Sequence, residues 1–165
     1  MCYELFDTSD TFTDRCDVGS ERESEIPLCP KTYARNHRNA RSLKQLFTKL
    51  HGVIADILDI SGRRVLEIGP GEGFLTKALL DRGATVISVE LDRRLIDLLT
   101  SRFSDKLASG ELTIIPSDAV KVPLPPFDIV MANLPYSISS PITFRLLEIG
   151  FESAILMYQK EFADR

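Results

Sequence analysis

The sequence has no apolar run that approaches the roughly 18 consecutive residues needed to cross a bilayer, which excludes a transmembrane helix. Its three cysteines, Cys2, Cys16 and Cys29, all lie within the first thirty residues. An odd number of cysteines at wide spacing argues against a closed disulfide framework and against a zinc site. We therefore expect free thiols in a reducing compartment and no bound metal.

The amino-terminal segment lacks the positive charge of a targeting peptide. The first 14 residues, MCYELFDTSDTFTD, contain acids but no Lys or Arg. A signal peptide or an Arg-rich transit peptide has the opposite charge pattern. We therefore expect a cytoplasmic protein that does not contact a membrane.

Basic residues are concentrated in one stretch. The chain has 165 residues, the size of one domain, and its 44% hydrophobic and 27% charged residues are typical of a globular protein. The net charge is −4, yet residues 30–51 contain six Lys and Arg, two His and no acid. This stretch can neutralise several phosphates or form a solvated linker, and the sequence leaves both interpretations open.

The chain divides into a polar leader and a periodic domain. Residues 1–40 are rich in Ser, Thr, Asp and Glu, so we expect a flexible or poorly ordered leader. Apolar residues at three- and four-residue spacing predict a helix over residues 43–58. The rest of the chain falls in a domain over residues 41–165.

Short apolar strands alternate with helices in this domain. The expected strands cover residues 63–69, 84–90, 111–118, 127–134 and 152–159. Strands separated by helices pair in parallel through right-handed crossovers. We predict an α/β, doubly wound Rossmann-like sheet of five parallel strands in the order 3-2-1-4-5.

A glycine-rich turn leaves the first strand and enters a helix. It contains Gly69, Gly71 and Gly73, and Glu67 precedes the first glycine by two residues. In a dinucleotide site a small residue would stand at position 74, where this chain has Phe74. The pattern G-x-G-x-G after an acid favours S-adenosylmethionine, which has no pyrophosphate to bind.

Two further acids follow the next two strands. Glu90 ends the second strand, where a carboxylate can accept both ribose hydroxyls, as in Rossmann sheets generally. Asp118 and Ala119 end the third strand, where an oxygen can accept the amino group of adenine. Each acid alone is equally well explained as a helix cap or turn residue, but three at successive strand ends favour a nucleoside cofactor.

The residues Asn133-Leu134-Pro135-Tyr136 follow the fourth strand. NLPY continues as SISSPITFRLL, with EIGPGEGFLT upstream and MYQKEFADR downstream. These motifs resemble the KsgA-type family of ribosomal RNA adenine N6,N6-dimethyltransferases, and the form SISSPITF is similar to that of its archaeal and eukaryotic members. The resemblance covers residues 43–165.

The resemblance implies an enzyme of ribosome biogenesis. Its expected activity is S-adenosylmethionine-dependent dimethylation of adenine N6 in small-subunit ribosomal RNA or a ribosomal subunit precursor, as a monomer and without a metal. A module that binds RNA or the ribosome without turnover is the alternative. A small-molecule methyltransferase is less favoured because NLPY suits a planar amino substrate.

The chemistry of an adenine amino group explains the NLPY motif. Its lone pair is delocalised into the ring, so two acceptors, the Asn133 side-chain oxygen and the Leu134 carbonyl, can draw the nitrogen toward tetrahedral geometry. Pro135 restricts the backbone that presents this carbonyl. Tyr136 offers a face for a flipped base, a contact of roughly 1–3 kcal/mol.

The sequence departs from the family at both ends. The family motif L-G-Q-x-F-L aligns with residues 43–48 and keeps Gln45 and Phe47, which are expected to cover the cofactor, but Lys44 replaces its glycine. The family continues with a helix, two strands and a C-terminal helical domain. We expect these to be absent here, which predicts a truncated domain, an uncovered fifth strand and weak or no activity of the chain alone.

Overall fold

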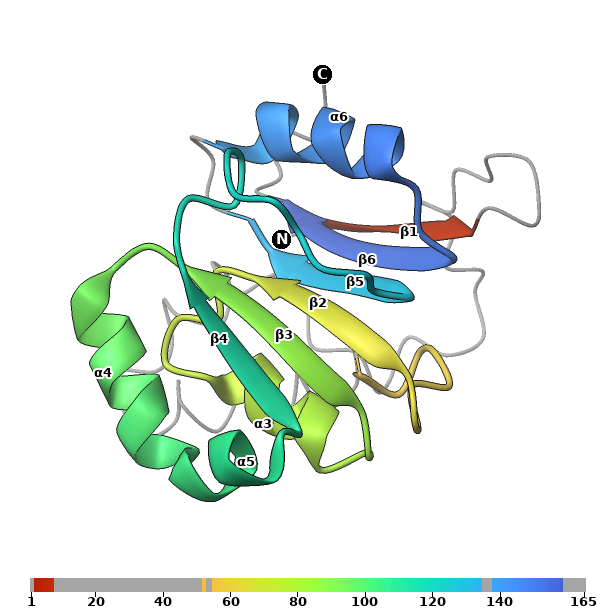
Figure 1. Ribbon diagram of the computed structural model, residues 1–165. Coiled ribbons are helices and arrows are strands. Elements are labelled where there is room, and N and C mark those ends of the chain that lie inside the picture. Colours follow the sequence, from red (N-terminus) through yellow and green to blue (C-terminus); the bar gives the residue numbers. More distant parts are fainter. Residues whose placement is uncertain (1, 8–51, 53–54, 135–137, 159–165) are drawn as a thin grey trace, which may run out of the picture.

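A single six-stranded sheet in the order β1-β6-β5-β2-β3-β4 organises the structure, a computed structural model that describes residues 2–7, 52, 55–134 and 138–158 (Figure 1). The predicted helix over residues 43–58 lies largely outside the described residues. The strands are β1 (Cys2–Asp7), β2 (Arg64–Ile68), β3 (Thr85–Glu90), β4 (Leu112–Pro116), β5 (Ile129–Asn133) and β6 (Ser153–Tyr158). The helices are α3 (Phe74–Leu80), α4 (Arg93–Arg102), α5 (Ser104–Ser109) and α6 (Ser139–Ile149).

The five predicted strands pair as expected. β2 pairs in parallel with β3 and β5, β3 with β4, and β5 with β6. In chain order these strands therefore lie as 3-2-1-4-5, and the predicted order is confirmed. The strand order changes direction at β2, because β3 and β4 lie on one side of it and β5 and β6 lie on the other.

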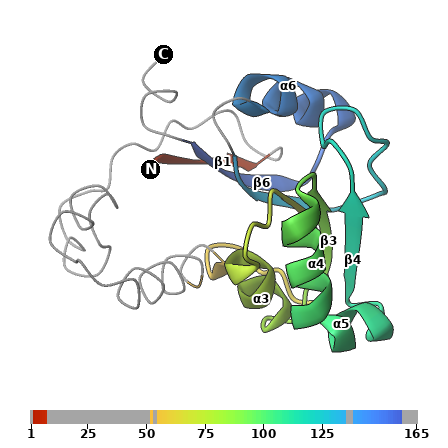
Figure 2. The same cartoon turned by 90° about the vertical axis from the view of Figure 1, so that its left-hand side faces the viewer.

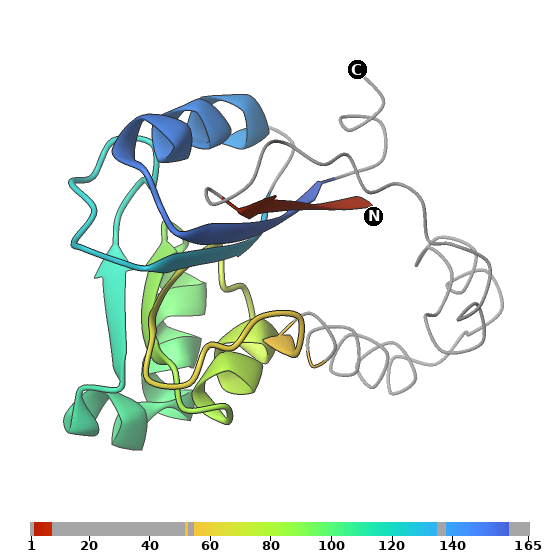
Figure 3. The ribbon, with the colours of Figure 1, turned by 90° about the vertical axis from the view of Figure 1, so that its right-hand side faces the viewer.

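Helices cover both faces of the sheet, and this explains why its strands are apolar throughout. Alternate side chains of β2 point to opposite faces: Val65 belongs to the core beneath α3 and α4, and Leu66 to the core beneath α6. Views from either side show α6 on one face and α3 and α4 on the other, while α5 lies at the lower end of β4 (Figures 2 and 3). The short helix α5 was not predicted as a separate element.

The outer edge of β6 is not uncovered, so that prediction was wrong. Residues Cys2–Asp7 form β1, which pairs antiparallel with β6 from Cys2 opposite Tyr158 to Asp7 opposite Ser153 (Figure 3). These six residues were expected to belong to a poorly ordered leader, but they form a strand. The segment CYELFD contains residues that favour strands, whereas the residues that follow it are mostly polar. Residues 8–40 lie outside the described part of the chain.

Proline scanning of β1 tests whether it stays paired in solution. Successive N–H groups of an edge strand point alternately to its partner and to solvent, so only one of Glu4→Pro and Leu5→Pro removes a donor to β6. That variant should accelerate hydrogen exchange of β6 amides by roughly 10- to 100-fold, and the other serves as its matched control. Equal exchange in both variants and in the unsubstituted chain would contradict the pairing.

Candidate functional site

The predicted site residues that the structure describes gather at one edge of the sheet. Parallel strands end at the same edge, and residues 68, 89 and 132 lie side by side in the register of β2, β3 and β5. The glycine turn follows β2, Glu90 ends β3, and Asn133 ends β5. The strand order changes direction at β2, and doubly wound sheets bind ligands at the carboxyl ends of the strands beside this point.

The glycine turn has a backbone that other residues rarely adopt. Gly69, Gly71 and Gly73 have φ values of 67°, 58° and 80°. The turn is closed by a hydrogen bond from the Gly73 N–H to the Pro70 carbonyl, at 2.9 Å, and tied to β3 by one from the Gly69 N–H to the Val89 carbonyl, at 3.0 Å. Among the described residues, no neighbouring heavy atom lies within 4 Å of the place that a Cβ on Gly71 would take, so this part of the chain leaves the turn open there.

Arg102, the last residue of α4, holds this turn from outside. Its guanidinium donates to the Glu72 carbonyl at 2.6 Å. The same group lies over the rings of Phe74 and Phe103, at 5.3 and 5.4 Å from their centroids. Cation–π contacts of this kind stabilise by roughly 0.5–1 kcal/mol at exposed sites. The glycine turn is therefore fixed both by its own hydrogen bonds and by α4.

Glu67 is buried beneath the turn with only 1% of its surface exposed. Its Oε2 accepts hydrogen bonds from the hydroxyls of Thr76 and Ser88, both at 2.7 Å. Its Oε1 is buried and has no hydrogen-bond partner among the described residues. Burial raises the pKa of Glu67 to about 7, although the two hydroxyls act in the opposite direction, and the nearby Glu90 adds to the rise.

Glu90 is held in one orientation by the backbone that follows it. Its Oε1 accepts hydrogen bonds from the N–H groups of Leu91 and Asp92, at 2.8 and 2.9 Å. No described residue donates to Oε2. Glu90 is 9% exposed, so its carboxylate is fixed on one side and available on the other.

Asp118 and Ala119 begin the turn that follows β4. The Asp118 Oδ1 accepts the Val120 N–H at 2.9 Å, and Oδ2 lies 3.4 Å from the Lys121 ammonium. The Val120 N–H is the main reason that the pKa of Asp118 lies below its usual range, with Lys121 and Arg145 adding to it. Ala119 is 6% exposed and packs in the core beneath α6.

The first half of NLPY lies at the carboxyl end of β5. Asn133 is half-buried, and Leu134 is 3% exposed. The Leu134 N–H donates to the Met157 carbonyl of β6 at 3.0 Å, which fixes the direction in which the chain leaves the sheet. Pro135 and Tyr136 lie outside the described residues, as do Gln45 and Phe47.

Comparison with known proteins identifies the family that has this arrangement. The profile described as ribosomal RNA adenine dimethylase matches residues 36–165. The chain belongs to the ribosomal RNA adenine dimethylase family. Its fold is the Rossmann-like fold of class I methyltransferases, as the sequence predicted.

Curated relatives carry names that agree with the family. Over 112 residues the chain is 80% identical to the probable ribosomal RNA small subunit methyltransferase A of Methanospirillum hungatei, covering 68% of this chain and 44% of that protein. Over 103 residues it is 52% identical to a ribosomal RNA small subunit methyltransferase of Arabidopsis thaliana, covering 61% of this chain and 29% of that protein. The chain therefore spans less than half the length of these relatives.

Two solved structures share the fold. The dimethyladenosine transferase of Plasmodium falciparum aligns with a TM-score of 0.58 at 40% identity, covering 70% of this chain and 42% of that one. The 23S ribosomal RNA methyltransferase ErmE aligns with a TM-score of 0.61 at 34% identity, covering 70% of this chain and 47% of that one.

Four residues around the candidate site were not predicted from the sequence: Thr76, Ser88, Arg102 and Arg145. Ser88 could have been predicted, because it is a polar residue within the apolar segment ATVISVE, which forms a buried strand. A buried hydroxyl in such a strand needs a hydrogen-bond partner, and the buried acid of the neighbouring strand supplies it. The other three have no comparable pattern in the sequence.

The described residues show neither a membrane span nor a metal centre. None of the helices in this part of the chain has the length and apolarity required to cross a bilayer. Within the same residues, His, Cys, Asp and Glu form no group of three or more that could hold a metal ion.

Proposed function

We propose that this chain binds S-adenosylmethionine at the glycine turn and presents adenine N6 of small-subunit ribosomal RNA to it at Asn133 and Leu134. The observation that carries the proposal is the meeting of the glycine turn, Glu90 and Asn133 at the carboxyl ends of three adjacent parallel strands. Family membership and the names of the relatives support the same reaction.

The residues that line this edge fit the cofactor. Open space at Gly71 allows a ligand to approach the backbone closely. The buried Glu67 Oε1, which has no partner among the described residues, would pair with the cofactor's ammonium. The available oxygen of Glu90 would accept the ribose hydroxyls, and Asp118 and Ala119 would meet the adenine. Gln45 and Phe47 stay predictions for the methionine end.

The chemistry of transfer then depends on the target amine. S-adenosylmethionine supplies a methyl group on a positively charged sulfonium, which makes the methyl reactive. The Asn133 side-chain oxygen and the Leu134 carbonyl would accept the two N–H bonds of the adenine amino group and turn its lone pair toward that methyl. The Leu134 N–H donates to the Met157 carbonyl, and this hydrogen bond fixes the Leu134 peptide. Pro135 and Tyr136 keep their predicted roles in restricting the loop and stacking on the base.

The wider setting of the reaction is also a proposal. The substrate would be small-subunit ribosomal RNA or a ribosomal subunit precursor, modified in the cytoplasm by a monomer without a metal. The test is methyl transfer from labelled S-adenosylmethionine to small subunits that lack the modification, with Asn133→Ala as the inactive control. Weak transfer is expected of the chain alone, so the same assay is run on a chain extended by the family's C-terminal portion. Binding of RNA without transfer in that longer chain would favour the alternative of a binding module without turnover.

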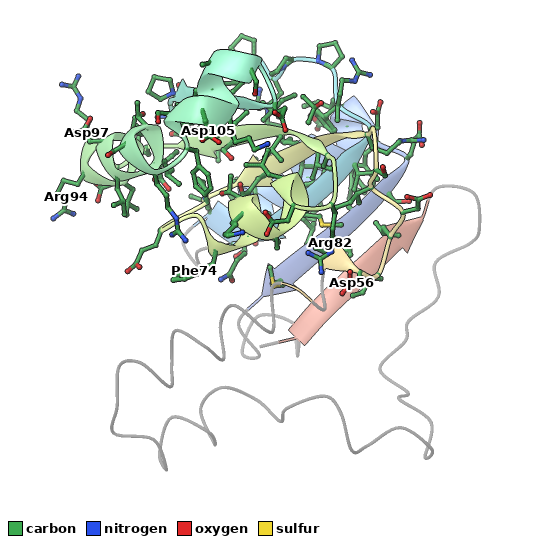
Figure 4. All side chains as sticks on the ribbon, turned by 90° about the horizontal axis from the view of Figure 1, so that it is seen from below. Asp56, Phe74, Arg82, Arg94, Asp97 and Asp105 are labelled. Carbon is green, nitrogen blue, oxygen red and sulfur yellow. The ribbon has the colours of Figure 1, made fainter. Side chains whose placement is uncertain are left out.

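Glu90→Ala tests the cofactor site separately from transfer. Loss of the carboxylate should weaken S-adenosylmethionine binding by roughly 10- to 100-fold, because hydrogen bonds to a charged acceptor contribute roughly 1.5–3 kcal/mol. Titration calorimetry measures the change. Asp97→Ala, which removes an exposed acid on the adjacent helix α4 (Figure 4), is the control and should leave the dissociation constant unchanged. Equal affinity in the two variants would remove Glu90 from the site.

A further inference from the structure

Arg145 connects two parts of the candidate site that lie far apart in the sequence. It stands on α6, the helix that follows the NLPY loop, and it is half-buried. Its guanidinium donates to two backbone carbonyls of the turn after β4, those of Ala119 and Val122. These carbonyls belong to the turn that begins with Asp118.

The turn also has apolar contacts with the core beneath α6, where Ala119 is buried and Val120 and Val122 pack against it. Inside the turn, the Asp118 carbonyl accepts the N–H groups of Lys121 and Val122, at 3.0 and 2.9 Å. The side chain of Asp118 accepts a hydrogen bond from the Val120 N–H. These hydrogen bonds lie within the turn, whereas those donated by Arg145 join its backbone to α6.

The chemistry of arginine suits this task. The guanidinium presents several N–H donors in a rigid plane, so one side chain can serve two carbonyls at once. Ala119 also packs in the same core as Leu134 and Ile142, so the turn, the end of β5 and α6 share one core. In Figure 1 the segment after β4 runs across to the side of the sheet where α6 lies.

We propose that Arg145 is a positioning residue that holds Asp118 and Ala119 where they recognise the cofactor's adenine, and so links that recognition to α6, the helix that follows NLPY in the sequence. The proposal rests on the proposed function, since it assumes a nucleoside cofactor at this turn. It adds a residue that touches neither cofactor nor substrate and acts through the backbone of residues 118–122.

The first experiment measures the turn without any ligand. Arg145→Met keeps an apolar stem and removes the donors. Its control is Arg82→Met, because Arg82 likewise donates to two carbonyls, those of Ala78 and Gly52, but lies after the end of α3 and beside Asp56 (Figure 4). Hydrogen exchange of the amides of residues 120–122 should become roughly 10-fold faster in Arg145→Met alone, the ratio for about 1.4 kcal/mol of local stability.

The second experiment measures adenine recognition. S-adenosylhomocysteine is compared with its inosine analogue, in which a carbonyl replaces the exocyclic amino group of the base. The unsubstituted chain and Arg82→Met should prefer the adenine form by roughly 10-fold, typical of one hydrogen bond to a charged acceptor, and Arg145→Met should lose most of this preference. A general loss of stability would weaken both ligands equally and leave the preference intact.

The two experiments test different parts of the proposal: the hold on the turn and the recognition of adenine. Unchanged exchange at residues 120–122 in Arg145→Met would overturn the proposal, and so would faster exchange with an unchanged preference for adenine. If the unsubstituted chain binds neither ligand, the proposed function fails for this chain, and the exchange result alone decides whether Arg145 holds the turn.

Discussion

Replacing Gly73 with alanine should lower the free energy of unfolding by about 2–5 kcal/mol, a large part of the 5–15 kcal/mol typical of a domain. Gly73 has a φ of 80°, and a left-handed backbone costs a residue with a Cβ about 1–2 kcal/mol. A Cβ at this position would also lie 2.6 Å from Phe103 Cε2 and 2.7 Å from Leu99 Cδ2. Overpacking of a core of this kind costs about 1–3 kcal/mol.

The neighbours of Gly73 have little room to move. Leu99 and Phe103 are 0% and 6% exposed, and both belong to the core beneath α3 and α4. Displacing the Phe103 ring would also disturb Arg102, which lies over that ring and donates to the Glu72 carbonyl. We therefore expect the substitution to distort the glycine turn itself, and cofactor binding to fall together with stability.

Gly62→Ala provides the matched control. Gly62 has a similar φ of 70°, but in the described part of the chain no neighbouring heavy atom lies within 4 Å of the place its Cβ would take. This variant should lose only the conformational cost of about 1–2 kcal/mol. Urea unfolding of the three proteins measures the difference, and an equal loss in Gly62→Ala and Gly73→Ala would show that Leu99 and Phe103 yield to the added carbon.

The sheet order and the location of the site followed from the sequence because both depend on local patterns. Short apolar strands between helices predict parallel pairing, and a glycine turn after the first strand predicts where a ligand binds. The strand ends at Glu90 and Asn133 then had to lie on the same edge as the turn. The structure confirms the strand order, while the roles of the individual residues stay predictions.

The elements that the sequence did not predict depend on contacts between distant residues. β1 pairs with a strand about 150 residues later, and no local pattern names its partner. Arg145 reaches carbonyls 23 and 26 residues earlier in the chain, where an arginine on a half-exposed helix is ordinarily a solvated side chain. The role of Thr76 also depends on a tertiary contact, because its hydroxyl reaches Glu67 only when α3 packs on the sheet.

Glu67 should make the stability of the protein depend strongly on pH. Burial raises the pKa of its carboxyl to about 7 from an ordinary value of 4.5. The folded chain therefore holds this proton more tightly than the unfolded chain does, so the group's contribution to stability is fully present below about pH 4.5 and is lost as the pH rises to about 7. From pH 5 to pH 8 the loss amounts to about 2–3 kcal/mol.

Glu67→Gln should remove this part of the pH dependence. The amide oxygen still accepts the hydroxyls of Thr76 and Ser88 but carries no charge at any pH. The stability of the variant relative to the unsubstituted chain should therefore improve by about 2–3 kcal/mol between pH 5 and pH 8, measured by urea unfolding at each pH. Glu148→Gln, which replaces an exposed acid on α6, is the control. A parallel pH profile for all three proteins would contradict the raised pKa.

The same carboxyl should report cofactor binding as a release of protons. If the cofactor's ammonium pairs with Glu67, as proposed, binding favours the ionised form and lowers the pKa of the carboxyl. At pH 6.5 a group with a pKa of about 7 is mostly protonated, so binding should release about 0.7 proton. Calorimetric titrations in two buffers with different ionisation enthalpies measure this number.

Glu67→Gln separates this proton from those of the other acids at the site. The variant should still bind the cofactor through Glu90 and the glycine turn, although more weakly, and it should release almost no proton at pH 6.5. Equal proton release from the variant and the unsubstituted chain would show that another group titrates. Glu67 would then be a buried acid that is satisfied only by its two hydroxyls, and the ammonium would need a different partner.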